Sequence, residues 1–154
     1  MDIEKIIRGY VPNVVHMSLG TCVNNRPWVC EVHFAYDDEL NLYFRSLVSR
    51  RHSQEIAENP LVAGNIVRQH QLGEYPLGVY FEGVAKKLDT STERQKAFSA
   101  INGRLHTGDD ILKEAEDPKG HQFYKITVNN WYVFGKLDDT GGKKYTLEWS
   151  GGEQ

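Results

Sequence analysis

The amino-acid sequence predicts a mainly β fold, in which an antiparallel barrel carries a few peripheral helices. About seven or eight segments have the composition and alternation that are typical of β-strands. Most of them follow one another directly along the chain, and only two substantial helical segments interrupt them. This order favours an antiparallel barrel over a parallel α/β sheet. Because the 154 residues contain no visible repeat or linker, we expect a single domain over residues 1–154.

The expected strands are apolar and aromatic segments that lie between turn-forming residues. Asn24 and Asn25 tolerate left-handed backbone angles and therefore predict a hairpin turn between the first two strands. A third strand follows after another short loop, which predicts an antiparallel meander. Gly83 inside a long strand indicates a bulge or the close approach of another backbone. The expected strands are residues 14–23, 28–36, 42–46, 61–67, 78–88, 123–128, 131–135 and 144–149, the last within a C-terminal strand and tail at 136–154.

The expected helices lie between or outside these strands. Thr90 and Glu93 have the spacing of a capping box, which marks the start of the most clearly amphipathic segment. The helix that follows Ser49 should end before Asn59-Pro60, because proline disfavours helical angles in the residue before it. The expected helices are residues 1–10, the segment from Ser49 to Asn59, 92–105 and 109–116.

The overall composition excludes several classes of protein. Hydrophobic residues make up 40% and charged residues 25% of the chain, as in ordinary globular proteins, and the formal net charge is -3. This charge argues against a nucleic-acid partner that is bound through a basic surface. No apolar segment is long enough to cross a membrane. Cys22 and Cys30 have no metal-ligand spacing, so we expect no metal and a reduced, cytoplasmic protein.

The sequence Ser49-Arg50-Arg51 predicts a candidate anion site at the start of a helix. Ser49 has the chemistry of an N-cap residue, and the next backbone amides would then have no partner within the helix. Cations are disfavoured there by the helix dipole, whereas a phosphate is favoured. Two guanidinium groups and the Ser46 hydroxyl would add charge-assisted hydrogen bonds. The alternative is that both arginines are simply solvated.

The segment LYFRSLVSRRHSQEIAENPLVAGNIV, residues 42–67, carries a family resemblance. It resembles the strand, Ser-Arg-Lys, helix, Asn-Pro, strand segment of the pyridoxamine-5′-phosphate-oxidase-like family of FMN-binding split barrels. RPWVCEVHFAYDD before it and VYFEGVAKKLDTSTERQKAF after it are similar to neighbouring elements of that family. The resemblance implies an antiparallel, Greek-key-like split β-barrel that binds FMN at the interface of a homodimer.

The resemblance also implies which residues hold the phosphate of FMN. By position, these residues are Ser46, Ser49, Arg50 and Arg51. The family usually has lysine where this chain has Arg51. Arginine keeps the charge but presents a planar fork of donors, so the geometry of the phosphate contact can differ.

Further cofactor contacts follow from the resemblance. Cys30, Glu31 and Val32 would run past the isoalloxazine ring and offer mainly backbone groups. Arg45 would lie near the ring edge or the ribityl chain, and Trp131 would reach the cofactor of the partner subunit. The C-terminal sequence KKYTLEWSGGEQ lacks the Trp…Arg-Leu-x-Pro region of true pyridoxamine phosphate oxidases, so the resemblance is to the broader family.

The resulting hypothesis is an FMN-dependent oxidoreductase that moves hydride or electrons between the flavin and a small substrate, with no catalytic residue identified. The alternative is a non-catalytic, stress-related dimer that binds flavin, haem or a deazaflavin. Glu31 and His33 point to the same face of a strand and allow a metal or acid–base pair, although a polar surface explains them better. The remaining histidines have no ligand spacing, and any of four could be an axial haem ligand: His16, His70, His106 and His121.

Overall fold

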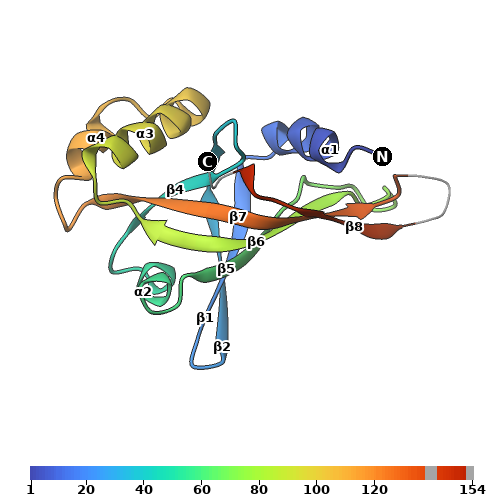
Figure 1. Cartoon of the computed structure of the whole chain (residues 1–154), viewed down its shortest axis with the longest axis horizontal. Helices are drawn as coiled ribbons and strands as arrows, with labels where there is room; N and C mark the ends of the chain where they lie inside the picture. The colour runs from blue at the N-terminus through green and yellow to red at the C-terminus, as the bar shows by residue number, and fades with distance from the viewer. Residues whose placement is uncertain (138–141, 152–154) are drawn as a thin grey trace.

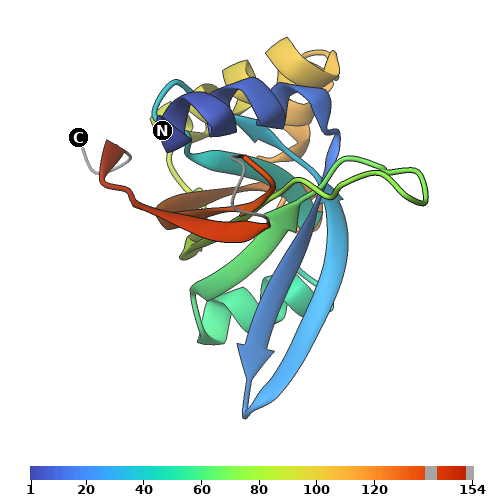
Figure 2. The same cartoon turned by 90° about the vertical axis from the view of Figure 1, so that its right-hand side faces the viewer.

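One antiparallel sheet of eight strands curls into a half-barrel and forms the frame of the molecule (Figures 1 and 2). The structure is a computed structural model, and it describes residues 1–137 and 142–151. The strand order is β2-β1-β5-β6-β7-β4-β3, and β8 also pairs with β7. All pairings between these strands are antiparallel, so the predicted antiparallel split barrel is confirmed.

The helices and strands follow the predicted order, and their bounds differ from the predicted ones by a few residues. The helices are α1 (Ile3–Tyr10), α2 (Arg51–Glu58), α3 (Ser91–Leu105) and α4 (Asp110–Glu114), with a 3-10 turn at Val11–Asn13. The strands are β1 (His16–Val23), β2 (Arg26–His33), β3 (Ala35–Tyr36), β4 (Leu42–Leu47), β5 (Leu61–Ile66), β6 (Gly78–Lys87), β7 (His121–Gly135) and β8 (Lys143–Glu148).

The first hairpin is as predicted, but the three-stranded meander is wrong. Asn24 and Asn25 have φ values of 52° and 60°, as a tight hairpin turn requires. After β2, the chain bends at Phe34, which is fully buried, and β3 leads into β4. β4 then pairs with β3 and β7, whereas β2 forms the opposite edge of the sheet. A short loop therefore joins strands that lie at opposite ends of the curled sheet.

The two strands predicted at 123–128 and 131–135 form one strand, β7. The sequence predicts an interruption between residues 128 and 131. The structure has a bulge at this point, because the β6–β7 register shifts between Glu82 and Gly83. A Cβ atom at Gly83 would lie 2.5 Å from the carbonyl oxygen of Thr127. The predicted close approach of another backbone at this glycine is thus confirmed, and it allows β7 to run along most of the sheet.

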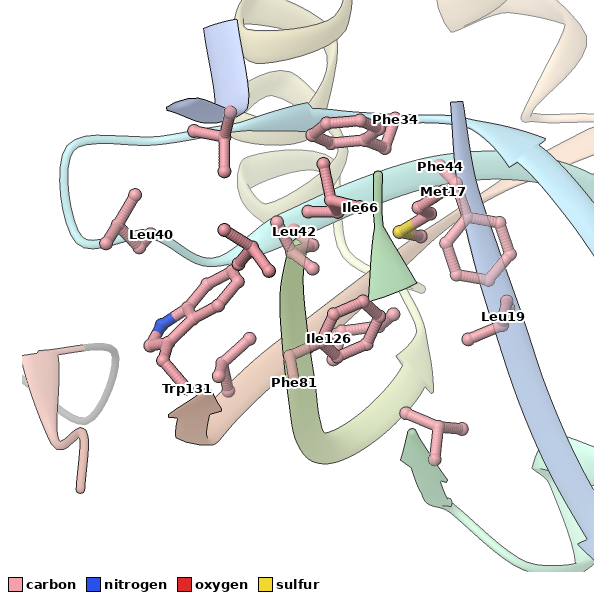
Figure 3. Close-up of a cluster of buried hydrophobic side chains, with 14 of the residues drawn as sticks. Met17, Leu19, Phe34, Leu40, Leu42, Phe44, Ile66, Phe81, Ile126 and Trp131 are labelled. Carbon is pink, nitrogen blue, oxygen red and sulfur yellow. The ribbon is translucent and has the colours of Figure 1, made fainter. Parts of the chain in front are cut away.

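Two hydrophobic clusters hold the sheet and helices together. The larger one fills the inside of the barrel, where the Phe81 and Trp131 rings lie 5.9 Å apart at an edge-to-face angle (Figure 3). The smaller one joins the outer side of β4 and β7 to α3 and α4, with Phe123 fully buried between them. α3 begins with the predicted capping box, in which the side chains of Thr90 and Glu93 both bond to backbone amides.

We expect Gly83→Ala to lower the free energy of unfolding by about 1–3 kcal/mol, because the added methyl group overlaps backbone that cannot move freely. Gly103→Ala is the matched control, since nothing lies within 4 Å of its Cβ position and alanine favours the helix. Urea denaturation of both variants measures the difference. Equal stability of the Gly83→Ala variant and the wild type would contradict the packing described at the bulge.

Candidate functional site

The candidate site is a cavity of about 740 Å³ in the opening of the barrel, between the edge strand β2 and the end of β4. The start of α2 and the end of α3 complete its wall. Of the residues predicted to contact a cofactor, Cys30, Glu31 and Val32 line it from β2. Arg45, Ser46, Arg50 and Arg51 line it from β4 and the start of α2. The fold therefore brings together seven of the nine predicted site residues.

The other two predicted residues lie elsewhere. Ser49 is exposed and lies outside the lining of the cavity. Trp131 is fully buried in the barrel core, where its ring packs against Phe81. The expectation that Trp131 reaches the cofactor of a partner subunit is therefore wrong, because an aromatic side chain with no exposed surface cannot contact a ligand on another chain.

The start of α2 differs from the prediction by one residue. Ser49 is not the N-cap; Arg50 is, with φ -68° and ψ 146° and no capping hydrogen bond from its side chain. The chain makes a turn before the helix, in which the amide of Arg50 donates to the carbonyl of Leu47 at 3.1 Å. The first helical residue is therefore Arg51. The backbone amides of the first helical turn, which lack acceptors within the helix, start at this residue.

Ser46 and His52 form a buried polar pair beside this helix start. The Ser46 Oγ and His52 Nε2 atoms are 2.7 Å apart, and both residues are less than 10% exposed. Burial lowers the pKa of His52 below its ordinary value, and the nearby Arg50 charge lowers it further, while Glu55 opposes the shift. The imidazole is consequently neutral at pH 7, and the pair places two groups capable of hydrogen bonding in the cavity wall.

The two adjacent arginines have different surroundings. The Arg51 Nε donates to Glu55 at 2.7 Å, and its guanidinium lies 4.2 Å from the centre of the Trp28 ring. The hydrogen bond from Arg51 is the main reason why the pKa of Glu55 is lowered. Arg50 is exposed and makes no side-chain hydrogen bond or ion pair within residues 1–137 and 142–151. Arg50 thus brings a positive charge without a partner to the cavity.

The β2 wall offers backbone groups and little reactive chemistry. β2 is paired only with β1, so the amides and carbonyls on its other edge have no strand partner in the described parts of the chain. Burial, and secondarily the charge of Glu31, raise the pKa of the Cys30 thiol to about 11, so that it stays protonated. The Ser18 hydroxyl donates to the Glu31 carboxylate. His33 stacks on His16 at 4.5 Å.

A second polar group lies in the wall of the same cavity, where His121 of β7 pairs with Leu47 at the end of β4. The Arg45 Nη2 is 2.6 Å from Glu114 Oε2, and the other oxygen of Glu114 is 2.7 Å from Nδ1 of His121. Hydrogen bonds from the backbone amide and the ring of His121, followed by the charge of Arg45, lower the pKa of Glu114. Arg45 is thus already paired within the protein, and His121 stands in the cavity wall.

Sequence reasoning missed His52 and Glu114 as parts of this site, and it named His121 only as one of four histidines that could ligate haem. His52 directly follows the arginine pair, so its place on the first turn of a helix was a signal for it. Glu114 and His121 carry no such signal, because they meet Arg45 only through the packing of α4 against β4 and β7. Within the described residues, no group of three or more His, Cys, Asp or Glu side chains could hold a metal ion.

Comparison with known families gives one match that covers most of the chain. Residues 3–135 match the profile of the family described as pyridoxamine 5′-phosphate oxidase. No curated protein matches the sequence at a significant level. None of the helices described for the chain is both long and apolar enough to cross a membrane.

Several solved structures have the same fold at low sequence identity. General stress protein 26 from Bacillus anthracis is 20% identical with a TM-score of 0.67, and the match covers 96% of this chain and 99% of that one. A FAD-binding protein from Mesorhizobium loti is 19% identical with a TM-score of 0.62, over 85% and 92% of the two chains. A haem-binding protein from Mycobacterium smegmatis is 16% identical with a TM-score of 0.77; the match covers 99% of this chain but 59% of that one.

We expect the stability of the cofactor-free protein to depend on pH through His52. Its folded-state pKa lies below the ordinary value of 6.5, so the unfolded chain binds more protons as the pH falls through that range. The free energy of unfolding should therefore decrease with falling pH, and His52→Gln should reduce this decrease. Urea denaturation between about pH 7.5 and 5 measures it, with Gln54→Asn as a neighbouring control that adds no titratable group. Parallel pH profiles for His52→Gln and the wild type would contradict the expected effect.

Proposed function

The chain belongs to the pyridoxamine 5′-phosphate oxidase family, and from this membership we propose that it binds FMN in the cavity between β2 and β4. The observation that carries the proposal is Arg50 beside the start of α2, whose side chain has no hydrogen-bond or ion-pair partner among the described residues. A guanidinium next to free helix amides repels other cations and attracts an anion. The terminal phosphate of FMN supplies such an anion.

The residues at the start of α2 fit a phosphate group. Arg50 and Arg51 offer charged donors, and Ser46 offers a hydroxyl in the same wall. Hydrogen bonds between such cations and a phosphate are roughly twice as strong as bonds between neutral groups. Because Arg51 already binds Glu55, Arg50 is the stronger candidate for the phosphate contact. Ser49, which lies outside the cavity lining, is not part of this proposal.

The rest of the cavity suits the flavin ring and a small substrate. Its volume of about 740 Å³ is within the usual range for sites that hold small ligands and cofactors. Cys30, Glu31 and Val32 on the open edge of β2 provide backbone donors and acceptors for the ring edge. When bound, FMN would supply the capacity to transfer hydride or electrons, which makes an oxidoreductase the proposed activity.

We also propose that two copies of the chain form a homodimer through the outer face of the sheet. Apolar side chains are unusually exposed there for β-strands: Val29 is 63% exposed, Leu61 62% and Val84 40%. Val29 and Leu61 line a shallow groove of about 560 Å³ on this face. Exposed apolar surface of this kind is typical of an interface with another protein. The groove adjoins β2, so the partner subunit would lie beside the proposed cofactor.

The remaining parts of the proposal concern location and partners. Cys22 and Cys30 are both free, which supports a reducing, cytoplasmic environment. The net charge of -3 supports a small-molecule substrate over nucleic acid. The second candidate function is haem binding, which is favoured by the fixed ring of His121 in the cavity wall, where the imidazole would serve as the iron ligand. Absorbance distinguishes the two, since a flavoprotein is yellow and a haem protein has a Soret band.

We expect Arg50→Ala to weaken FMN binding by about 1–2 kcal/mol, and Arg50→Ala with Arg51→Ala to weaken it by about 2–4 kcal/mol. Arg51→Ala alone should have the smaller single effect, because that guanidinium is already shared with Glu55. Fluorescence titration with FMN measures these affinities. Riboflavin, which lacks the phosphate, should bind the variants and the wild type equally well.

Arg8→Ala is the control for these variants, because Arg8 is paired with Glu4 on α1 and is not part of the cavity lining. It should bind FMN like the wild type. If the double variant retains the affinity of the wild type for FMN, the phosphate assignment is wrong. If the wild type binds neither FMN nor riboflavin and FMN does not raise its melting temperature, the proposed function itself is wrong.

We expect Val29→Glu to convert the dimer to a monomer and to weaken FMN binding, because the new carboxylate would be buried without a partner at the interface. Sedimentation velocity measures the mass, with 17.6 kDa expected for one chain. Val15→Glu is the control, since Val15 is also exposed, at 53%, but lies outside the groove. A wild type that sediments as a monomer while it holds FMN would refute the dimer.

A further inference from the structure

His121 is the best oriented polar side chain in the cavity wall that has no part in the proposed phosphate site. Its Nδ1 lies 2.7 Å from Glu114 Oε1, and its backbone amide donates to the same oxygen at 2.9 Å. The second oxygen of Glu114 is fixed by Arg45 at 2.6 Å. The ring is thus held by a carboxylate that is itself held in place, in a chain of contacts that joins β4, α4 and β7.

This arrangement determines which ring nitrogen carries the proton. An ionised carboxylate only accepts hydrogen bonds, so the contact with Glu114 requires a proton on Nδ1 of His121. The lowered pKa of Glu114 keeps this carboxylate ionised at neutral pH. In the neutral ring, the unshared electron pair is then on Nε2. This atom lies on the opposite edge of the ring and has no hydrogen-bond partner among the side chains and backbone that the structure describes.

Apolar side chains also line the cavity in whose wall His121 lies. Ile101 and Leu105 line the same cavity from the end of α3, and Thr107 follows them. Ile101 is 2% exposed, so its side chain is fixed in the packed layer between α3 and the sheet. A cavity that combines apolar side chains with a few oriented polar groups is typical of sites that recognise small ligands.

We propose that the part of the cavity beside His121 binds the substrate, and that it selects a small, mainly apolar molecule whose hydroxyl or amine group donates a hydrogen bond to Nε2 of His121. This inference rests on the proposed function, because the substrate would lie beside the flavin in the same cavity. Leu105, which is only partly buried, contacts the apolar part of the ligand. Arg45 and Glu114 are positioning residues, since they fix the ring without contacting the ligand.

A purely structural role for the same contacts is the competing explanation. Glu114 also fixes the start of β7 through the backbone of His121, so the three residues could serve only to hold α4 on the sheet. That role requires the carboxylate but makes no use of Nε2. The two explanations therefore differ in what they predict for a ligand with a donor group and for the same ligand without one.

The experiment uses the FMN-loaded protein with phenol and toluene as probes, which have nearly the same shape but differ in the donor hydroxyl. NMR titration measures both affinities for the wild type and for His121→Phe. We expect His121→Phe to weaken phenol binding about five- to tenfold, the usual effect of one lost hydrogen bond, and to leave toluene binding unweakened. The Nε2 resonance of His121 in the wild type should report an unprotonated nitrogen and should shift on addition of phenol.

His16→Phe is the matched control, because His16 is another histidine on the sheet, is exposed, and is not part of the cavity lining. It should bind phenol as the wild type does. Glu114→Gln should weaken phenol binding less than His121→Phe and should produce a mixture of the two ring tautomers. The proposal is overturned if phenol and toluene respond equally to His121→Phe, or if Nε2 carries the proton in the wild type. Unchanged FMN absorbance in each variant separates these outcomes from failure of the proposed cofactor site.

Discussion

The hydrogen-bonded ladder of a sheet that curls without closing is the constraint on which the rest of the structure depends. β2 pairs with β1 on one edge only, and β4 pairs with β7 and β3 at the other end of the sheet. The two ends therefore face each other across a cavity instead of forming backbone hydrogen bonds. Strand edges and helix ends carry donors and acceptors that need partners. The opening of the barrel consequently collects the polar groups that a closed barrel would have satisfied internally.

Three described arginines line this cavity, and acidic side chains pair with two of them. Arg45 is paired with Glu114 and Arg51 with Glu55, so each has a fixed direction. These pairs are partly exposed and add little to the stability of the fold, but they orient the side chains around the cavity. Arg50 has no such partner, and its charge also acts on the buried His52. An anion that binds here would relieve the repulsion between neighbouring cations, which is why we assign the phosphate end of the ligand to this corner.

Local signals in the sequence predicted much of the fold and part of the candidate site. The hairpin at Asn24-Asn25, the capping box at Thr90 and the bulge at Gly83 depend on nearest neighbours, and all three are confirmed. The meander was wrong because strand pairing is decided by the burial of Phe34 and by the curl of the sheet, not by loop length.

Side-chain placement was predictable only where it followed from strand and helix order. Seven predicted residues meet in the cavity because they lie on β2, β4 and the start of α2, although their contact with a cofactor stays a prediction. The position of Trp131 depended on which face of β7 is inside the barrel, and the extra residue Asn129 in the bulge of β7 conceals that from the sequence. The contact of Glu114 with His121 depends on the docking of α4, for which the sequence carries no local signal.

The most direct test of the central claim is a crystal structure of the protein with FMN bound. The account predicts electron density for the phosphorus atom at the start of α2, with phosphate oxygens within hydrogen-bonding distance of Arg50, the Ser46 hydroxyl and the free amides of the first helical turn. It also predicts the isoalloxazine ring along the open edge of β2. A phosphate that points into bulk solvent, or a flavin bound away from the opening of the barrel, would contradict the account.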